Sequence, residues 1–65
     1  MTLRQMRERV NLRQEDVARR MNVDQGTVSK WEKGVHIPPR KYHKKLARIY
    51  GVTVDELLSE SEVSR

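Results

Sequence analysis

The segment QEDVARRMNVDQGTVSKWEKG, residues 14–34, decides the fold. It carries two apolar stripes with the spacing of an α-helix, separated by a polar interval. The stripes consist of Val17, Ala18 and Met21, and then of Val28 and Trp31. The pattern predicts two short helices joined by a tight turn, with Trp31 in the core rather than stacked on a base.

The residues between and after these two helices favour the turn and the helix ends. Asn22 lies where the chain must reverse, and asparagine tolerates left-handed backbone. Asp24 is placed to cap the helix that follows the turn with its carboxylate, although this carboxylate could instead accept a hydrogen bond from cytosine. Gly34 is placed to end the helix that follows the turn. Helix, turn and helix are therefore each specified locally.

The helix that follows the turn carries hydrogen-bonding groups and positive charge at its solvent-facing positions, and no large hydrophobe. They are Gln25, Gly26, Thr27, Ser29, Lys30 and Lys33. Glutamine can make a bidentate contact with adenine, and lysine can donate to guanine O6 and N7. A helix that docks on a protein would need an apolar patch here, so this face predicts contact with nucleic acid.

Upstream, a first helix is expected from Thr2, which can cap it, to Asn11, with Leu3, Met6 and Val10 on one buried stripe. Leu12 is expected to fill the core between the first two helices. Arg13 occupies the capping position of the helix that starts at Gln14, and its side chain cannot accept amide hydrogen bonds. We therefore expect this helix start to be less stable.

Downstream, two prolines exclude helix until Pro39, which is suited to the first position of a helix over Arg40–Tyr50 that Gly51 ends. Thr53 and Glu56 form a capping box for a short fifth helix through Leu58.

The remaining segment, residues 59–65, is polar and acidic, and we expect a flexible tail. The expected fold is all-α, a compact bundle of five helices over residues 1–58. Its predicted core consists of Leu3, Met6, Val10, Leu12, Val17, Ala18, Met21, Val28, Trp31, Leu46, Ala47 and Leu57.

Composition limits the functions that this chain can have. Its 65 residues allow one small domain, and the absence of cysteine excludes disulfides and thiolate metal sites. No apolar run approaches the roughly 20 residues that span a bilayer, and the N-terminal segment lacks the pattern of a secretory signal. Residues 1–50 hold 13 Lys/Arg and 5 Asp/Glu, a net charge of +8. A basic body of this kind suits a polyanionic partner, but on charge alone it could equally be the solvated surface of an ordinary soluble domain. The absence of cysteine is compatible with the expected location in the cytoplasm.

Residues 3–58 resemble the Cro-like and phage-repressor helix-turn-helix family. The matching motifs are LRQEDVA in the second helix, TVSKWEKG in the third and LARIYGVTVDELL at the end. The resemblance implies a bacterial or phage-like transcription regulator, most simply a repressor, that binds operator DNA as a dimer on a palindromic site. The alternative is an antitoxin or another protein-interaction module on the same scaffold.

The resemblance also implies a role for each matching residue. Gln25, Gly26 and Lys30 would face base edges, and Thr27 would lie close to the backbone or a thymine methyl. Arg7 and Glu32 would form an internal ion pair. The residues that would contact phosphates are Gln14, which would also brace the third helix, Arg13, Ser29, Lys33, Arg40 and Lys41.

The sequence departs from the family pattern at four positions. Gly26 supplies no side chain where relatives often read a base, and Lys33 replaces the frequent Asn beside Gly34. Arg40 and His43 stand where relatives bury leucine, so we expect Ile37, Tyr42 and Tyr50 to fill that space.

Several side chains allow a second interpretation. The basic cluster consists of Lys41, Lys44, Lys45 and Arg48, and it is either a second nucleic-acid surface or a solvated helix face. His36 and His43 have no cysteine or suitably spaced carboxylate beside them, so no metal site is expected. No cofactor or enzymatic activity is expected either, because the chain has no arrangement of nucleophile and base and no glycine-rich phosphate loop.

Overall fold

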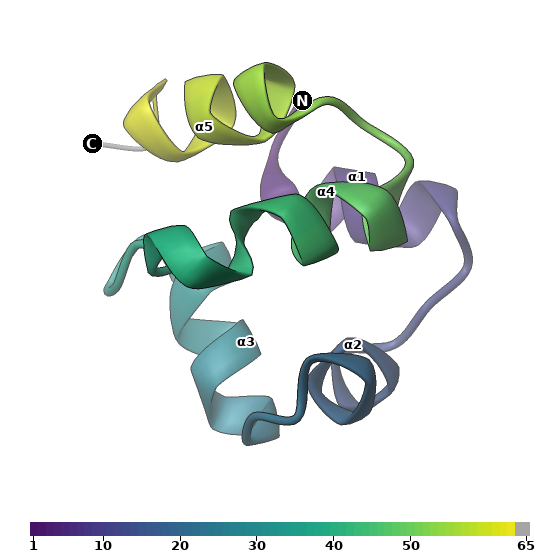
Figure 1. Cartoon of the computed structure of the whole chain (residues 1–65). Helices are drawn as coiled ribbons and strands as arrows, with labels where there is room; N and C mark the ends of the chain where they lie inside the picture. The colour runs from purple at the N-terminus through teal and green to yellow at the C-terminus, as the bar shows by residue number, and fades with distance from the viewer. Residues whose placement is uncertain (64–65) are drawn as a thin grey trace.

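The computed structural model describes the backbone of residues 1–63 and the side chains of residues 1–59. All regular structure in that part of the chain is helical, as expected for an all-α fold (Figure 1). The elements are α1 (Leu3–Arg9), α2 (Gln14–Met21), α3 (Gln25–Lys33), the 3₁₀ turn η1 (Arg40–Tyr42), α4 (His43–Tyr50) and α5 (Val54–Val63).

Local side-chain chemistry sets most of the helix ends. The Thr2 hydroxyl accepts a hydrogen bond from the Gln5 amide (3.1 Å), and the Gln5 side chain accepts one from the Thr2 amide (2.8 Å), which forms a capping box. Asn22 ends α2 in the left-handed conformation (φ 59°), and Gly34 ends α3 in the same way (φ 78°). These predicted ends are confirmed.

The second helix begins without help from the Arg13 side chain. Instead, the Asp16 carboxylate accepts a hydrogen bond from the Arg13 amide at 2.9 Å. The turn into α3 differs from the prediction, since Asp24 occupies the capping position but its carboxylate makes no capping hydrogen bond. The Asp24 carbonyl closes that turn, and it accepts hydrogen bonds from the amides of Thr27 (3.0 Å) and Val28 (3.4 Å).

The start of the fourth helix was predicted wrongly. Arg40–Tyr42 form a 3₁₀ turn, Pro39 precedes it in extended conformation, and regular α-helix begins only at His43. Helix termini often tighten into such turns. His43 stabilises this one by donating a hydrogen bond from Nε2 to the Pro38 carbonyl at 2.8 Å.

The fifth helix begins with the predicted capping box, but it ends later than predicted. The Thr53 hydroxyl accepts from the Glu56 amide (3.0 Å), and the Glu56 carboxylate accepts from the Thr53 amide (2.9 Å). The helix continues to Val63, beyond the predicted end at Leu58, because the intervening serines and glutamates do not break a helix. The predicted flexibility of residues 59–65 concerns mainly side chains that lie outside the described residues, and it stays a prediction.

One apolar core joins all five α-helices. The buried hydrophobic residues are Leu3, Met6, Val17, Ala18, Met21, Val28, Trp31, Leu46, Ala47, Tyr50 and Leu57. The predicted core members Val10 and Leu12 are only half-buried at its edge. Tyr50 is buried and Tyr42 packs its ring against Trp31, with ring centroids 5.7 Å apart, but Ile37 is 61% exposed and does not fill the expected space.

The packing places α2 and α3 together at one end of the molecule (Figure 1). At the opposite end, α5 packs against α1 and α4, and α4 also contacts α2. The outer face of α3 therefore points away from the rest of the bundle, where a partner can approach it.

Candidate nucleic-acid interface

Helix α3 is anchored on one side and open on the other. Val28 and Trp31 are buried, at 0% and 4% exposure, and they hold the helix against the core. The predicted base-facing residues Gln25, Gly26 and Lys30 are all exposed. An added Cβ on Gly26 would meet no atom within 4 Å, so this glycine leaves a gap in the side-chain layer of α3. A base edge can approach the backbone closely there.

Two open hollows flank α3 and turn it into a ridge. One hollow, of about 350 Å³, is lined by Thr27 and Lys30 together with the loop that follows the helix. The other, of about 490 Å³, is lined by Gln14, Ser29 and Lys33. A helix that stands out between two hollows has the shape that enters the major groove of B-DNA, which is about 12 Å wide.

An ion pair fixes α3 to α1. The Nε atom of Arg7 lies 2.6 Å from Oε2 of Glu32, and Nη2 of Arg7 lies 3.2 Å from Oε1. A third bond joins Arg7 Nη1 to the Leu12 carbonyl at 2.9 Å. The two charged side chains are only 11% and 6% exposed. The hydrogen bond with Glu32 is the main reason that the pKa of Arg7 is raised.

Gln14 and Gln25 extend this ion pair to the exposed end of α3. Gln14 Nε2 donates to Glu32 Oε1 at 3.0 Å, and Gln25 Nε2 lies 3.5 Å from Gln14 Oε1. The sequence predicted that Gln14 braces α3, but not that it does so by a hydrogen bond to the carboxylate of the ion pair. No spacing rule reports such a contact, because it joins side chains from two helices.

Tyr50 is a further neighbour of this pair that the sequence did not indicate. Burial raises the pKa of its phenol, and the negative charge of Glu32 raises it further while Arg7 opposes the shift. Tyr50 therefore stays neutral beside the ion pair at neutral pH. The only sequence signal for this position was its apolar spacing with Leu46 and Ala47.

The predicted phosphate ligands come from three different elements, and they are exposed except for Gln14 and Ser29, which are half-buried. Gln14, Ser29 and Lys33 share one hollow beside α3. Arg13 precedes α2 and lies 3.7 Å from the Glu15 carboxylate, with both side chains largely in solvent. Arg40 and Lys41 belong to η1, and the Lys41 ammonium lies 5.1 Å from the centre of the Tyr42 ring. The structure thus brings together only the first three.

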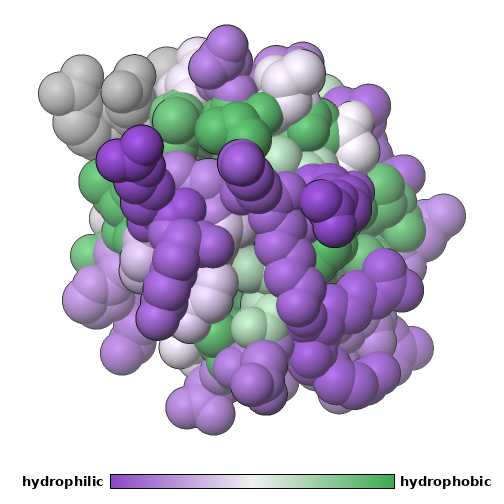
Figure 2. All heavy atoms as spheres, viewed as in Figure 1, coloured by the Kyte–Doolittle hydropathy of each residue, from purple (hydrophilic) through white to green (hydrophobic). Residues whose placement is uncertain are grey.

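The basic cluster of Lys41, Lys44, Lys45 and Arg48 occupies one face of η1 and α4. All four residues are exposed, at positions three or four residues apart. Figure 2 shows that hydrophilic side chains cover much of the face that α4 turns to the viewer. The arrangement gives a continuous positive stripe, and it leaves both interpretations of this cluster open.

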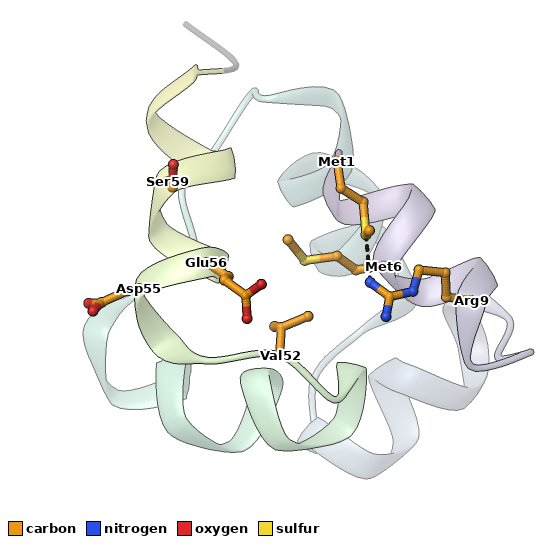
Figure 3. A pocket seen from close by; sticks show the side chains of 7 residues that line it. All are labelled: Met1, Met6, Arg9, Val52, Asp55, Glu56 and Ser59. Carbon is orange, nitrogen blue, oxygen red and sulfur yellow. Dashed lines mark hydrogen bonds between the residues drawn. The ribbon is translucent and has the colours of Figure 1, made fainter.

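A third cleft lies between α1 and α5, at the end of the molecule away from α2 and α3. It has a volume of about 340 Å³, and Figure 3 shows Val52 and Glu56 of its lining turned toward α1. Arg9 donates a hydrogen bond to the Met1 sulfur across its rim at 3.0 Å. Thr53 donates hydrogen bonds that lower the pKa of Glu56, so this side chain carries negative charge at neutral pH. The charged side chains that line the cleft are thus two carboxylates, Asp55 and Glu56, and one guanidinium, Arg9.

The described residues lack two other features, a metal site and a membrane-spanning helix. They include no group of three His, Asp or Glu side chains that could hold a metal ion. Among them, no helix is both long and apolar enough to cross a membrane.

Comparison with known proteins agrees with the geometry. A helix-turn-helix family model matches residues 3–57. The chain is 39% identical over 61 residues to the transcriptional activator BcrR of Enterococcus faecalis. The matched residues cover 94% of this chain and 30% of that protein. It is also 39% identical over 62 residues to the phage CTXphi repressor RstR of Vibrio cholerae, covering 95% of this chain and 56% of that protein.

The chain thus spans between about a third and about half of the length of these relatives. No solved structure matches it. The family match covers almost all of the described helices, and both relatives are transcription regulators by name. The chain therefore belongs to the helix-turn-helix family of DNA-binding transcription regulators.

Proposed function

We propose that this domain binds double-stranded DNA in a sequence-specific way by inserting α3 into the major groove. The observation that carries the proposal is the exposed ridge of α3, whose outer side chains are polar or basic while Val28 and Trp31 hold its inner side in the core. Gln25 and Lys30 are the side chains suited to base edges, and Gly26 allows close approach. Lys33, Gln14 and the basic residues around the ridge would hold phosphates.

Two copies of the domain would bind a palindromic operator. One domain offers only two base-reading side chains on α3, and each good contact contributes about 1–3 kcal/mol of discrimination. A dimer doubles this number of contacts and places the two recognition helices one turn of DNA apart. Occupying such a site is sufficient to block transcription, and we therefore propose that the protein acts as a repressor.

A specific observation favours a protein partner as the second candidate. Val35 and Ile37, in the loop after α3, are 63% and 61% exposed. They lie outside the polar face of α3, so they are compatible with DNA binding and would fit either the second subunit or an unrelated protein. An antitoxin or interaction module on this scaffold would use this loop and would not need the polar ridge.

Selection of bound sequences from random duplex DNA tests the proposal. We expect enrichment of a palindrome whose half-sites are about 10 base pairs apart. The double variant Gln25→Ala, Lys30→Ala is the matched control, because both residues are exposed and their loss leaves the core intact. It should fold and enrich no consensus. If the unchanged protein also enriches no sequence, specific binding is excluded and the interaction module becomes the better account.

A further inference from the structure

The basic cluster on η1 and α4 has no charge partner among the described residues. The segment 33–54 contains six Lys/Arg and no Asp/Glu. The arginines that do have carboxylate partners lie in or next to α1 and α2, and they are Arg4, Arg7, Arg13 and Arg19. In the described part of the chain, no carboxylate forms an ion pair with a member of the basic cluster. Its positive charge therefore faces solvent unneutralised.

These cations occupy positions that do not stabilise α4. Lys44 and Lys45 lie in the first turn, which holds no acidic residue and where the helix dipole disfavours positive charge. Arg48 follows them by four and three residues, and like charges at this spacing repel each other. A face that served only solubility would be better built from charges of both signs. A bound anion explains the cluster better than folding does.

The basic cluster begins beside the ridge of α3. Tyr42 of η1 lines the same hollow as Thr27 and Lys30, so η1 borders the ridge. Lys41 is the residue before Tyr42, and α4 leads from η1 across the front of the molecule (Figure 1). The positive surface therefore continues from the outer face of α3 along α4.

The chemistry and the length of the cluster fit a DNA strand. Three of its four members are lysines, whose compact ammonium groups bind phosphates as point charges without the planar fork of arginine. From Lys41 to Arg48 the cluster extends over about 10 Å, because each helical residue adds about 1.5 Å. Phosphates of one strand follow each other every 3.4 Å or so along the duplex axis. About three consecutive phosphates can therefore lie against the cluster.

We propose that Lys44, Lys45 and Arg48 bind backbone phosphates of the operator duplex next to the base pairs that α3 reads. They add a contact surface that is independent of sequence to the recognition helix, on the far side of η1 from the ridge. This proposal rests on the proposed function. The partner is DNA and not an acidic protein, because the cluster continues the surface of α3 and offers no apolar anchor among its exposed side chains.

The first measurement is the affinity for the selected operator between 50 and 200 mM salt. The test protein is the triple variant Lys44→Gln, Lys45→Gln, Arg48→Gln. Its plot of log affinity against log salt should lose about 2–3 units of slope, since each phosphate contact contributes about 0.9. The loss of affinity over this salt range then becomes up to about 40-fold smaller. Preferences among single-base variants of the operator should not change, because phosphates carry no base information.

The second measurement locates the contacts by ethylating single operator phosphates and finding those whose ethylation blocks binding. With the unchanged protein, a run of interfering phosphates should adjoin the base pairs that α3 reads. In the triple variant this run should cease to interfere, while the phosphates bound by Lys33 should still do so.

The matched control compares Arg48→Gln with Arg9→Gln. Both arginines are exposed on a helix, and both substitutions remove one positive charge. Arg9 lines the cleft between α1 and α5, at the end away from α2 and α3. Arg48→Gln should lower the salt slope by about one unit, whereas Arg9→Gln should leave it unchanged.

Urea unfolding followed by the fluorescence of Trp31 gives a further readout. The triple variant should be at least as stable as the unchanged protein, because it loses like-charge repulsion and unfavourable charge at the start of α4. Should it nevertheless not fold, Arg48→Gln and Arg9→Gln decide by the same criteria.

The proposal is overturned if the folded triple variant keeps the salt slope and the ethylation pattern of the unchanged protein. The cluster is then a solvated face or serves an acidic protein. A lower slope with an unchanged ethylation pattern, or equal effects of Arg48→Gln and Arg9→Gln, also overturns it, since net charge alone then acts. If no operator can be selected, the proposed function itself fails, and this outcome precedes any comparison of variants.

Discussion

Removing one member of the ion pair between Arg7 and Glu32 should destabilise the fold at least as much as removing both, and replacing each residue by methionine tests this. The two side chains are 11% and 6% exposed, so water cannot hydrate a charge that has lost its partner. Removing one member of a buried pair costs about 3–5 kcal/mol, whereas replacing both by apolar groups is often close to neutral.

The structure places the expected values at the lower end of this range. After Arg7→Met, Glu32 still accepts a hydrogen bond from Gln14, and after Glu32→Met, Arg7 still donates to the Leu12 carbonyl. We therefore expect each single substitution to lower the free energy of unfolding by about 3 kcal/mol, and the double substitution by no more than either single one. The coupling free energy is then about 3 kcal/mol. This is a large part of the total of roughly 3–10 kcal/mol expected for a domain of this size.

Urea unfolding followed by the fluorescence of Trp31 measures these changes, because this indole is 4% exposed and passes into water on unfolding. A stabilising osmolyte keeps the single variants folded. The surface pair of Arg4 and Glu8, at 69% and 53% exposure, is the control, and its cycle should give no more than about 0.5 kcal/mol. Additive effects of Arg7→Met and Glu32→Met would refute the reasoning.

Four further outcomes are expected. Gly51→Ala should lower the free energy of unfolding by about 1 kcal/mol, because residue 51 has a φ of +69° that disfavours a side chain. Gly26→Ala should raise the free energy of unfolding by roughly 0.5–1 kcal/mol, because residue 26 lies inside a helix and an added Cβ would meet no atom within 4 Å. Urea unfolding measures both changes. Hydrogen bonds from Thr53 lower the pKa of Glu56. The stability that they give the fold is therefore present above the usual glutamate pKa of 4.5, and it is lost as the pH falls through the lowered pKa. The variant Glu56→Gln lacks this titration, so its free energy of unfolding should fall less steeply over that acid range. Deleting residues 59–65 should leave the dissociation constant for DNA unchanged in a gel-shift titration.

The fold could be predicted largely because its signals are local. Left-handed backbone at Asn22 and Gly34 follows from residue type, and the buried positions of Val28 and Trp31 follow from helical spacing. The errors occur where a side chain had an alternative that sequence does not reveal. Asp24 leaves its carboxylate in solvent because the backbone closes the turn, and His43 hydrogen-bonds a carbonyl beyond the helix start.

The candidate site could be predicted only as a set of exposed positions. Helical spacing places Gln25 and Lys30 on the open face of α3, and the structure agrees that both are exposed. The link from Glu32 through Gln14 to Gln25 depends on the mutual positions of α2 and α3, so it could not be read from the sequence. Which of the exposed residues contact bases stays a prediction.

The central claim, that α3 reads base edges, is tested most directly by affinity across all single-base variants of the selected operator at two salt concentrations. We expect Lys30→Ala to relax preference at one position per half-site, by about 1–3 kcal/mol. Lys33→Ala should leave every preference unchanged and reduce the salt dependence by about one unit of slope. If Lys30→Ala instead weakens all operator variants alike and lowers the salt slope, Lys30 contacts a phosphate, and the proposed docking of α3 is contradicted.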